Sequence, residues 1–119
     1  MILVDTSVWV AHFRFDNAGF AELLERQAVL THPFVIGELA CGNLKNRTRV
    51  LGDLEALTAV TIAEHRMVLH MIDVHRLWAK GIGWIDSHLL ASALITRCAL
   101  WTLDKRLACA AAQLGIPAA

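Results

Sequence analysis

Short runs of apolar residues alternate along this chain with longer stretches in which apolar residues recur every three or four positions. Residues 1–4 are all apolar and too few for a helix, so they predict a strand that is buried on both faces. Similar short runs predict three more strands, at 28–31, 59–62 and 99–103.

Helical periodicity fills the intervals between these runs. The predicted helices cover residues 7–14, 20–27, 33–42, 47–57, 64–80, 85–97 and 105–114. The longest of them, 64–80, has the spacing of a helix with one buried stripe. That stripe consists of Met67, Met71, Val74 and Trp78.

Strands that alternate with helices predict an α/β sandwich built on a parallel sheet. The 119 residues contain no linker and no internal repeat, and this length is typical of one domain with one core. We therefore expect a single domain over residues 1–119.

The composition is 56% hydrophobic, but acidic residues interrupt every apolar run well before the roughly 18 residues of a spanning helix. The first residues also lack the basic segment of a signal peptide. We therefore expect a cytoplasmic protein without a membrane segment. Cys41, Cys98 and Cys109 form no CxxC pair, which argues against a disulfide framework and a zinc site and predicts small core residues.

Acidic residues occupy four unusual places in this pattern. The strands at 1–4 and 99–103 lead into Asp5 and Asp104, and in a parallel sheet both carboxylates reach the same edge. Glu38 lies within the helical segment PFVIGELACG, with no Lys or Arg within six positions. Asp86 follows GIGWI and opens a helix that is nearly free of charge.

Four converging carboxylates would repel one another by roughly 1 to 4 kcal/mol per pair at about 4 Å. A divalent cation removes that repulsion, and hard oxygen ligands suit Mg²⁺ or Mn²⁺. Such ions activate water and stabilise an in-line displacement at phosphorus. A simpler interpretation is that Asp5, Asp86 and Asp104 each cap the helix that follows, and that Glu38 lies on the surface.

Basic and histidine residues add less to this picture. The formal net charge is zero, so nothing in the total indicates a nucleic-acid partner. Two basic clusters could nevertheless contact a phosphate backbone, or could simply be solvated surface; they are Lys45, Arg47 and Arg49 in KNRTR, and Lys105 and Arg106 after Asp104. His88, two residues after Asp86, could take part in the site, but its ring is expected to be exposed to solvent.

The four acids and their surroundings together resemble the PIN-domain ribonucleases, and among these the VapC toxins of bacterial toxin–antitoxin pairs. The resemblance rests on DTS after the first strand, PFVIGE, WIDSHLLASAL and TLDKRL, and it covers essentially the whole chain. It implies a PIN-like three-layer α/β/α sandwich with a central parallel sheet. It also implies that Asp5, Glu38, Asp86 and Asp104 are metal ligands, supported by Thr6 or Ser7 and by Thr102.

The function implied by this resemblance is that of an Mg²⁺- or Mn²⁺-dependent endoribonuclease, in which metal-activated water cleaves RNA. The family commonly forms homodimers and is inhibited by a cognate antitoxin protein. The sequence departs from the family pattern after Asp104, where Lys-Arg-Leu replaces the usual aromatic residue. The alternative is a catalytically silent PIN-like module that binds RNA or a protein partner.

Overall fold

Three short parallel strands lie at the centre of the molecule in the order β2-β1-β3. They are β1 (Ile2–Val4), β2 (Val29–Leu30) and β3 (Ala99–Trp101) of a computed structural model that describes residues 1–119. Leu3 of the central strand lies opposite Leu30 on one side and Leu100 on the other. Leu3 is completely buried, as predicted for a strand covered on both faces.

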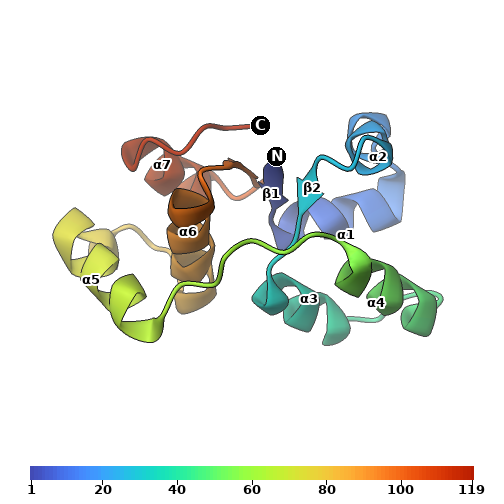
Figure 1. The fold of residues 1–119 in the computed structure, drawn as a ribbon, viewed down its shortest axis with the longest axis horizontal. Coiled ribbons are helices and arrows are strands. Elements are labelled where there is room, and N and C mark those ends of the chain that lie inside the picture. Colours follow the sequence, from blue (N-terminus) through green and yellow to red (C-terminus); the bar gives the residue numbers. More distant parts are fainter.

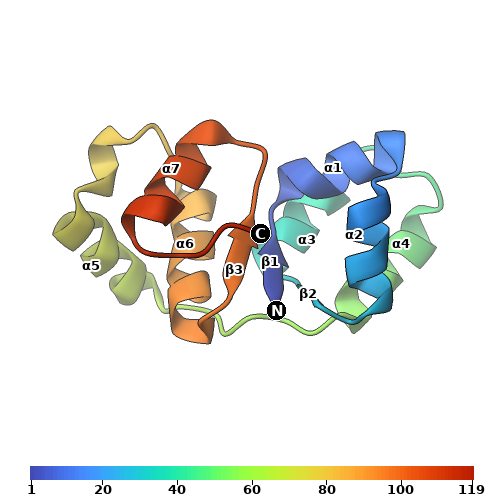
Figure 2. The same ribbon diagram turned by 90° about the horizontal axis from the view of Figure 1, so that it is seen from above.

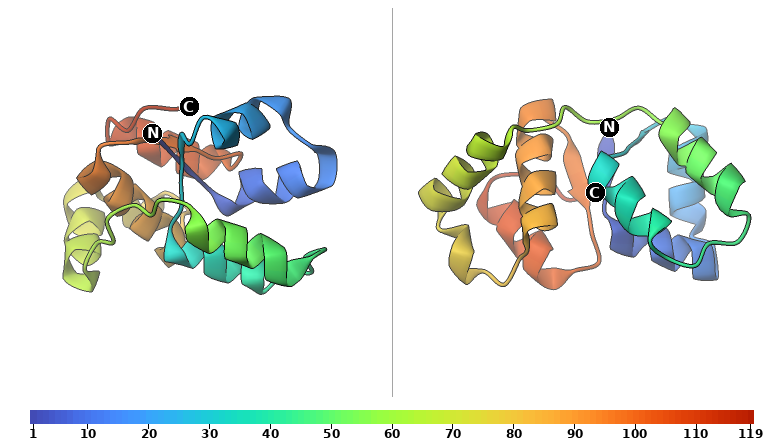
Figure 3. Two further views of the ribbon diagram at one scale, coloured as in Figure 1. Left: turned by 45° about the vertical axis from the view of Figure 1, so that its right-hand side comes forward. Right: turned by 90° about the horizontal axis from the view of Figure 1, so that it is seen from below.

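Helices cover both faces of this sheet, so the predicted three-layer α/β/α arrangement is confirmed (Figures 1 and 2). One layer contains α1 (Thr6–Phe15), α2 (Ala18–Glu25), α3 (Pro33–Ala40) and α4 (Arg47–Ala56). The other contains α5 (His65–His75), α6 (Trp84–Thr96) and α7 (Lys105–Gln113). Residues 57–64 connect the two layers as an extended segment, seen from below in Figure 3.

The prediction of a strand over residues 59–62 is wrong. Only Ala59 pairs with the sheet, through a single parallel bridge to Thr31. The Thr31 N–H donates to the Thr58 carbonyl and the Val60 N–H to the Thr31 carbonyl, each at 2.9 Å. Pairing cannot continue because Pro33 has no N–H and already begins α3. A similar single bridge joins Leu100 to Ala118 on the opposite side of the sheet.

The predicted long helix over 64–80 is also shorter than expected. It ends at His75, because Arg76 adopts a left-handed conformation with φ 54°, and a 3₁₀ turn (Leu77–Ala79) follows.

The predicted stripe on this helix is wrong at three of its four positions. Val68 and Met71 are the buried residues, whereas Met67, Val74 and Trp78 are exposed. The buried face of α5 is thus rotated from the predicted stripe toward Val68, and Met71 belongs to both.

The cysteine prediction holds for Cys98, which is buried, and fails for Cys41 and Cys109, which are exposed. Cys41 lies at the C-terminal end of α3, and Cys109 lies on the exposed face of α7. The local sequence does not indicate whether such positions are buried. No helix of the structure is both long enough and apolar enough to cross a membrane.

Candidate functional site

Asp5 follows β1 and is buried, with only 6% of its surface exposed. Its Oδ1 accepts the Thr6 N–H at 2.7 Å, and its Oδ2 accepts the hydroxyls of Ser7 at 2.8 Å and Thr102 at 2.7 Å. These three hydrogen bonds compensate the loss of water around a buried carboxylate. They also orient it, so the predicted supporting residues do contact the first acid.

Glu38 projects from α3 and is exposed. Its Oε1 accepts the Thr6 hydroxyl at 2.8 Å, so Thr6 joins the start of α1 to the middle of α3. Through this bond, Glu38 is held near Asp5, which precedes Thr6 in the chain.

Asp86 and Asp104 come from the other helical layer. Asp86 lies in the first turn of α6, where its Oδ2 accepts the Gly83 N–H at 3.4 Å. Asp104 caps α7: its Oδ1 accepts the N–H groups of Arg106 at 2.8 Å and Leu107 at 3.3 Å. The Asp104 N–H in turn donates to the Thr102 hydroxyl at 3.0 Å, which ties this cap to the network around Asp5.

The structure brings the four predicted acids to the carboxyl edge of the sheet, two from each helical layer. Their proximity is visible in the pKa of Asp86, which is raised above its usual value. Burial is the largest cause, partly opposed by the hydrogen bond from Gly83, and the charges of Asp5, Asp104 and Glu38 raise the pKa further.

The helix-capping interpretation of Asp5 and Asp104 is confirmed, yet it leaves acceptor capacity for a further ligand. Each cap contact uses one carboxylate oxygen, and Oδ2 of Asp104, Oδ1 of Asp86 and Oε2 of Glu38 accept no hydrogen bond within the protein. A carboxylate offers about four acceptor positions, so even Asp5 has one left. Capping and metal binding are therefore compatible at these positions.

The donor set has the chemistry that a hard divalent cation requires. All four groups are carboxylates, and no Lys or Arg pairs with any of them, because the ion pairs present are Arg26–Glu22 and Arg49–Asp53. As the side chains stand, no three His, Cys, Asp or Glu residues are grouped closely enough to hold a metal ion. Shared binding of one ion therefore requires some of these side chains to rotate.

The predicted basic clusters occupy different surroundings. Lys45 lines a groove that also contains Glu38, and Lys105 and Arg106 line a hollow at the start of α7. Arg47 donates to the Gly42 carbonyl at 3.4 Å, and Arg49 pairs with Asp53 on the exposed side of α4. Sequence reasoning missed Arg14 and Lys80, which line the same two cavities, because neither stands in a basic run.

The prediction that His88 is exposed is wrong, since it is buried beside His32 in a row of aromatic rings. Phe34 and Trp84 cover its ring edge to face, with centroids at 4.8 and 4.7 Å. Burial lowers the pKa of His88, with a smaller effect of His65. Burial also lowers the pKa of His32 to about 4, with a smaller effect of His88.

The chain matches a known protein family over nearly its whole length. A family model described as the PIN domain matches residues 2–113, and the chain belongs to the PIN-domain family. It is also similar to Ribonuclease VapC32 from two strains of Mycobacterium tuberculosis, CDC 1551 / Oshkosh and H37Rv. The identity is 45% over 117 residues, which cover 98% of this chain and 94% of each relative.

A solved structure shares the fold at much lower sequence similarity. The crystal structure of PAE2754 from Pyrobaculum aerophilum superposes with a TM-score of 0.62 and 16% identity. The match covers 92% of this chain and 78% of that one. This likeness concerns the fold alone.

Proposed function

We propose that this protein is a divalent-metal-dependent endoribonuclease whose reaction centre is formed by Asp5, Glu38, Asp86 and Asp104. The observation that carries the proposal is that these four acids lie at one edge of the sheet, where Asp5, Asp104 and Glu38 raise the pKa of Asp86 and no basic side chain neutralises them. The ribonuclease name of relatives that match almost the whole chain supports the same class of activity.

Mg²⁺ or Mn²⁺ bound by these carboxylates would offset their repulsion, activate a water molecule and stabilise negative charge at an RNA phosphodiester. The remaining roles belong to the protein's own hydroxyls. Thr102 and Ser7 fix the orientation of the Asp5 carboxylate, and Thr6 restrains Glu38. These residues position the reacting groups and are not themselves assigned a chemical step.

The biological setting belongs to the same proposal. We propose a toxin of a VapBC-like toxin–antitoxin pair, acting in the cytoplasm on RNA and inhibited by a cognate antitoxin. A homodimer is proposed as well. Large apolar side chains exposed on several elements support self-association or the binding of a protein partner, and they include Phe15, Ile62, Val74, Trp78 and Leu103.

The direct test is to incubate the purified protein, free of any antitoxin, with a mixed pool of RNAs. Cleavage in Mg²⁺ or Mn²⁺ and none in EDTA is the expected result. A folded protein that cuts no RNA with either ion would contradict the proposal.

The ungrouped carboxylates favour one second candidate, a silent PIN-like module that binds RNA or protein without cutting. A calorimetric titration separates the two, because the silent module predicts no binding of Mg²⁺ or Mn²⁺ at the four acids.

A further inference from the structure

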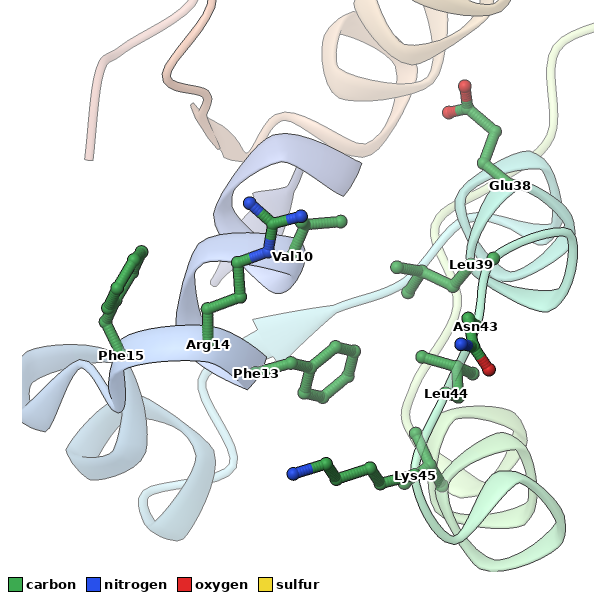
Figure 4. A pocket seen from close by; sticks show the side chains of 11 residues that line it. Val10, Phe13, Arg14, Phe15, Glu38, Leu39, Asn43, Leu44 and Lys45 are labelled. Atoms are coloured by element: carbon green, nitrogen blue, oxygen red, sulfur yellow. The ribbon is translucent and has the colours of Figure 1, made fainter.

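Two groups of basic side chains line depressions near the four acids, one in each helical layer. Lys80, Lys105 and Arg106 line a hollow of about 210 Å³ beside the start of α7. Arg14 and Lys45 line a larger groove of about 750 Å³ between α1 and α3, which also contains Glu38 (Figure 4). Glu38 lines the larger groove, and Asp104 directly precedes Lys105 of the smaller hollow, so each basic depression borders one of the four acids.

None of these five cations is neutralised within the protein. The ion pairs of the molecule involve Arg26 and Arg49 only, and all five side chains are exposed. Long cations that stay unpaired beside a cavity are available to an anionic ligand. The acids between them repel such a ligand unless it spans them, which a chain of phosphates can do.

The Arg106 side chain passes close to Gly81, in the turn that leads to α6. A Cβ on Gly81 would lie 3.0 Å from Cδ of Arg106 and 3.1 Å from its Nη1, and Gly81 has a φ of +72°. Only glycine fits there without strain. The arginine stem therefore packs against the turn that precedes Asp86, while Arg106 itself follows Asp104 by two residues.

The larger groove combines its cations with an apolar floor. Phe13, Leu39 and Leu44 point into it, and the Lys45 side chain reaches toward α1 (Figure 4). Phe13 keeps 41% of its surface exposed, although it is a large aromatic residue. Cations beside an accessible aromatic ring are typical of surfaces that hold a single nucleic-acid strand by its phosphates and bases.

We propose that single-stranded RNA crosses the acids along the long axis of the molecule, with a basic subsite on each side. Lys80, Lys105 and Arg106 hold phosphates on one side. Arg14 and Lys45 hold phosphates on the other, where a base stacks on Phe13. This inference rests on the proposed function. It adds Arg14, Lys80 and Phe13 as RNA-binding residues, and Gly81 as the residue that leaves room for the Arg106 side chain.

The test measures the binding of a fluorescent 12-nucleotide RNA of mixed sequence by anisotropy, across a salt series. All variants carry Asp86→Asn, so that binding is read without cleavage. Arg14→Ala, Lys80→Ala and Arg106→Ala should each weaken binding severalfold, and each should reduce the slope of log affinity against log salt by about 0.7. Phe13→Leu should weaken binding without changing that slope. The matched control is Arg26→Ala, which removes the same charge from an exposed ion pair at the end of α2.

Equal losses in Arg26→Ala and the subsite variants would overturn the proposal, because binding would then follow net charge alone. Losses at Lys80 and Arg106 but not at Arg14 or Phe13 would overturn the two-sided path and leave the groove to a protein partner. A gel of the same samples tests the proposed function separately: RNA cut in the Asp86→Asn background would remove Asp86 from the reaction centre while leaving the binding result intact.

Discussion

Thr102 Oγ1 donates a hydrogen bond of 2.7 Å to Asp5 Oδ2, across 97 positions of the sequence. The two residues follow neighbouring parallel strands, and the same hydroxyl accepts the N–H of Asp104 at 3.0 Å. One threonine therefore connects two of the four acids of the proposed reaction centre. Thr102 therefore stabilises the fold through its hydrogen bond to the buried Asp5 carboxylate, and it also positions Asp5 and Asp104.

We expect Thr102→Val to lower the free energy of unfolding by about 1.5 to 3 kcal/mol, because the variant removes a hydrogen bond to a charged acceptor without changing the side-chain shape. It should also reduce RNA cleavage. Urea unfolding at pH 7 measures the first effect. Thr102→Ser keeps the hydroxyl and should stay close to the wild type; equal stability of the valine variant would show that this bond contributes nothing.

The raised pKa of Asp86 predicts how its removal changes stability with pH. A carboxyl group whose pKa is higher in the folded state favours folding below its unfolded value of 3.8, and this advantage is lost as pH rises through the folded pKa. In EDTA, Asp86→Asn should therefore be more stable than the wild type at pH 7, and the difference should vanish below pH 3.8.

Urea titrations between pH 3.5 and 7.5 test this expectation. Asp73→Asn is the control, because it removes a carboxylate from the exposed surface of α5. If Asp86→Asn is no more stable than the wild type at neutral pH, burial and the neighbouring acids do not disfavour the Asp86 carboxylate as described.

His32 predicts an acid-sensitive step in stability. Its Nδ1 accepts the Phe34 N–H at 2.9 Å and caps α3, and its pKa is lowered to about 4 from 6.5. For a histidine with a lowered pKa, stability is fully present above pH 6.5 and is lost as pH falls toward 4, because the unfolded chain takes up the proton first. The loss should reach about 3 kcal/mol near pH 4.

His32→Asn isolates this effect, since asparagine can still accept the N-cap hydrogen bond and does not titrate. The variant should lose some stability at every pH by reduced packing, but its stability should change less between pH 6.5 and 4. If the free energy of unfolding falls equally with pH in the wild type and in His32→Asn, His32 is not the cause of the acid-sensitive step.

Gly81 should act on RNA binding through Arg106. Gly81→Ala should weaken binding severalfold, because the added Cβ displaces the arginine side chain. It should also cost about 1 kcal/mol of stability, owing to the positive φ. In an Arg106→Ala background, the same substitution should lower stability again yet leave RNA affinity unchanged. A further loss of affinity in the double variant would show that Gly81 acts independently of Arg106.

The strand-end acids could be predicted from sequence because their placement depends on local pattern and one general rule. Apolar runs that end in Asp5 and Asp104 are readable in the sequence, and parallel pairing brings both ends to one edge. Glu38 and Asp86 stood out as charges within otherwise apolar helices.

Features that depend on how the layers meet could not be predicted. The periodicity of 64–80 is equally consistent with a buried stripe through Met67 or Val68, and only packing on α6 decides between them. Arg76 carries no sequence signal for a left-handed helix end. The same limitation applies to Arg14 and Lys80, which are brought to the two basic cavities only by tertiary structure.

The most direct test of the reaction centre compares one RNA substrate with the wild type and four single variants, Asp5→Asn, Glu38→Gln, Asp86→Asn and Asp104→Asn, in Mg²⁺ and in EDTA. Each variant should lose about a hundredfold or more of the cleavage rate, and EDTA should abolish the wild-type rate. The products should carry one phosphomonoester and one free hydroxyl, as attack by water requires. Cleavage that survives EDTA and yields a 2′,3′-cyclic phosphate would contradict the account, because the RNA's own 2′-hydroxyl would then be the nucleophile.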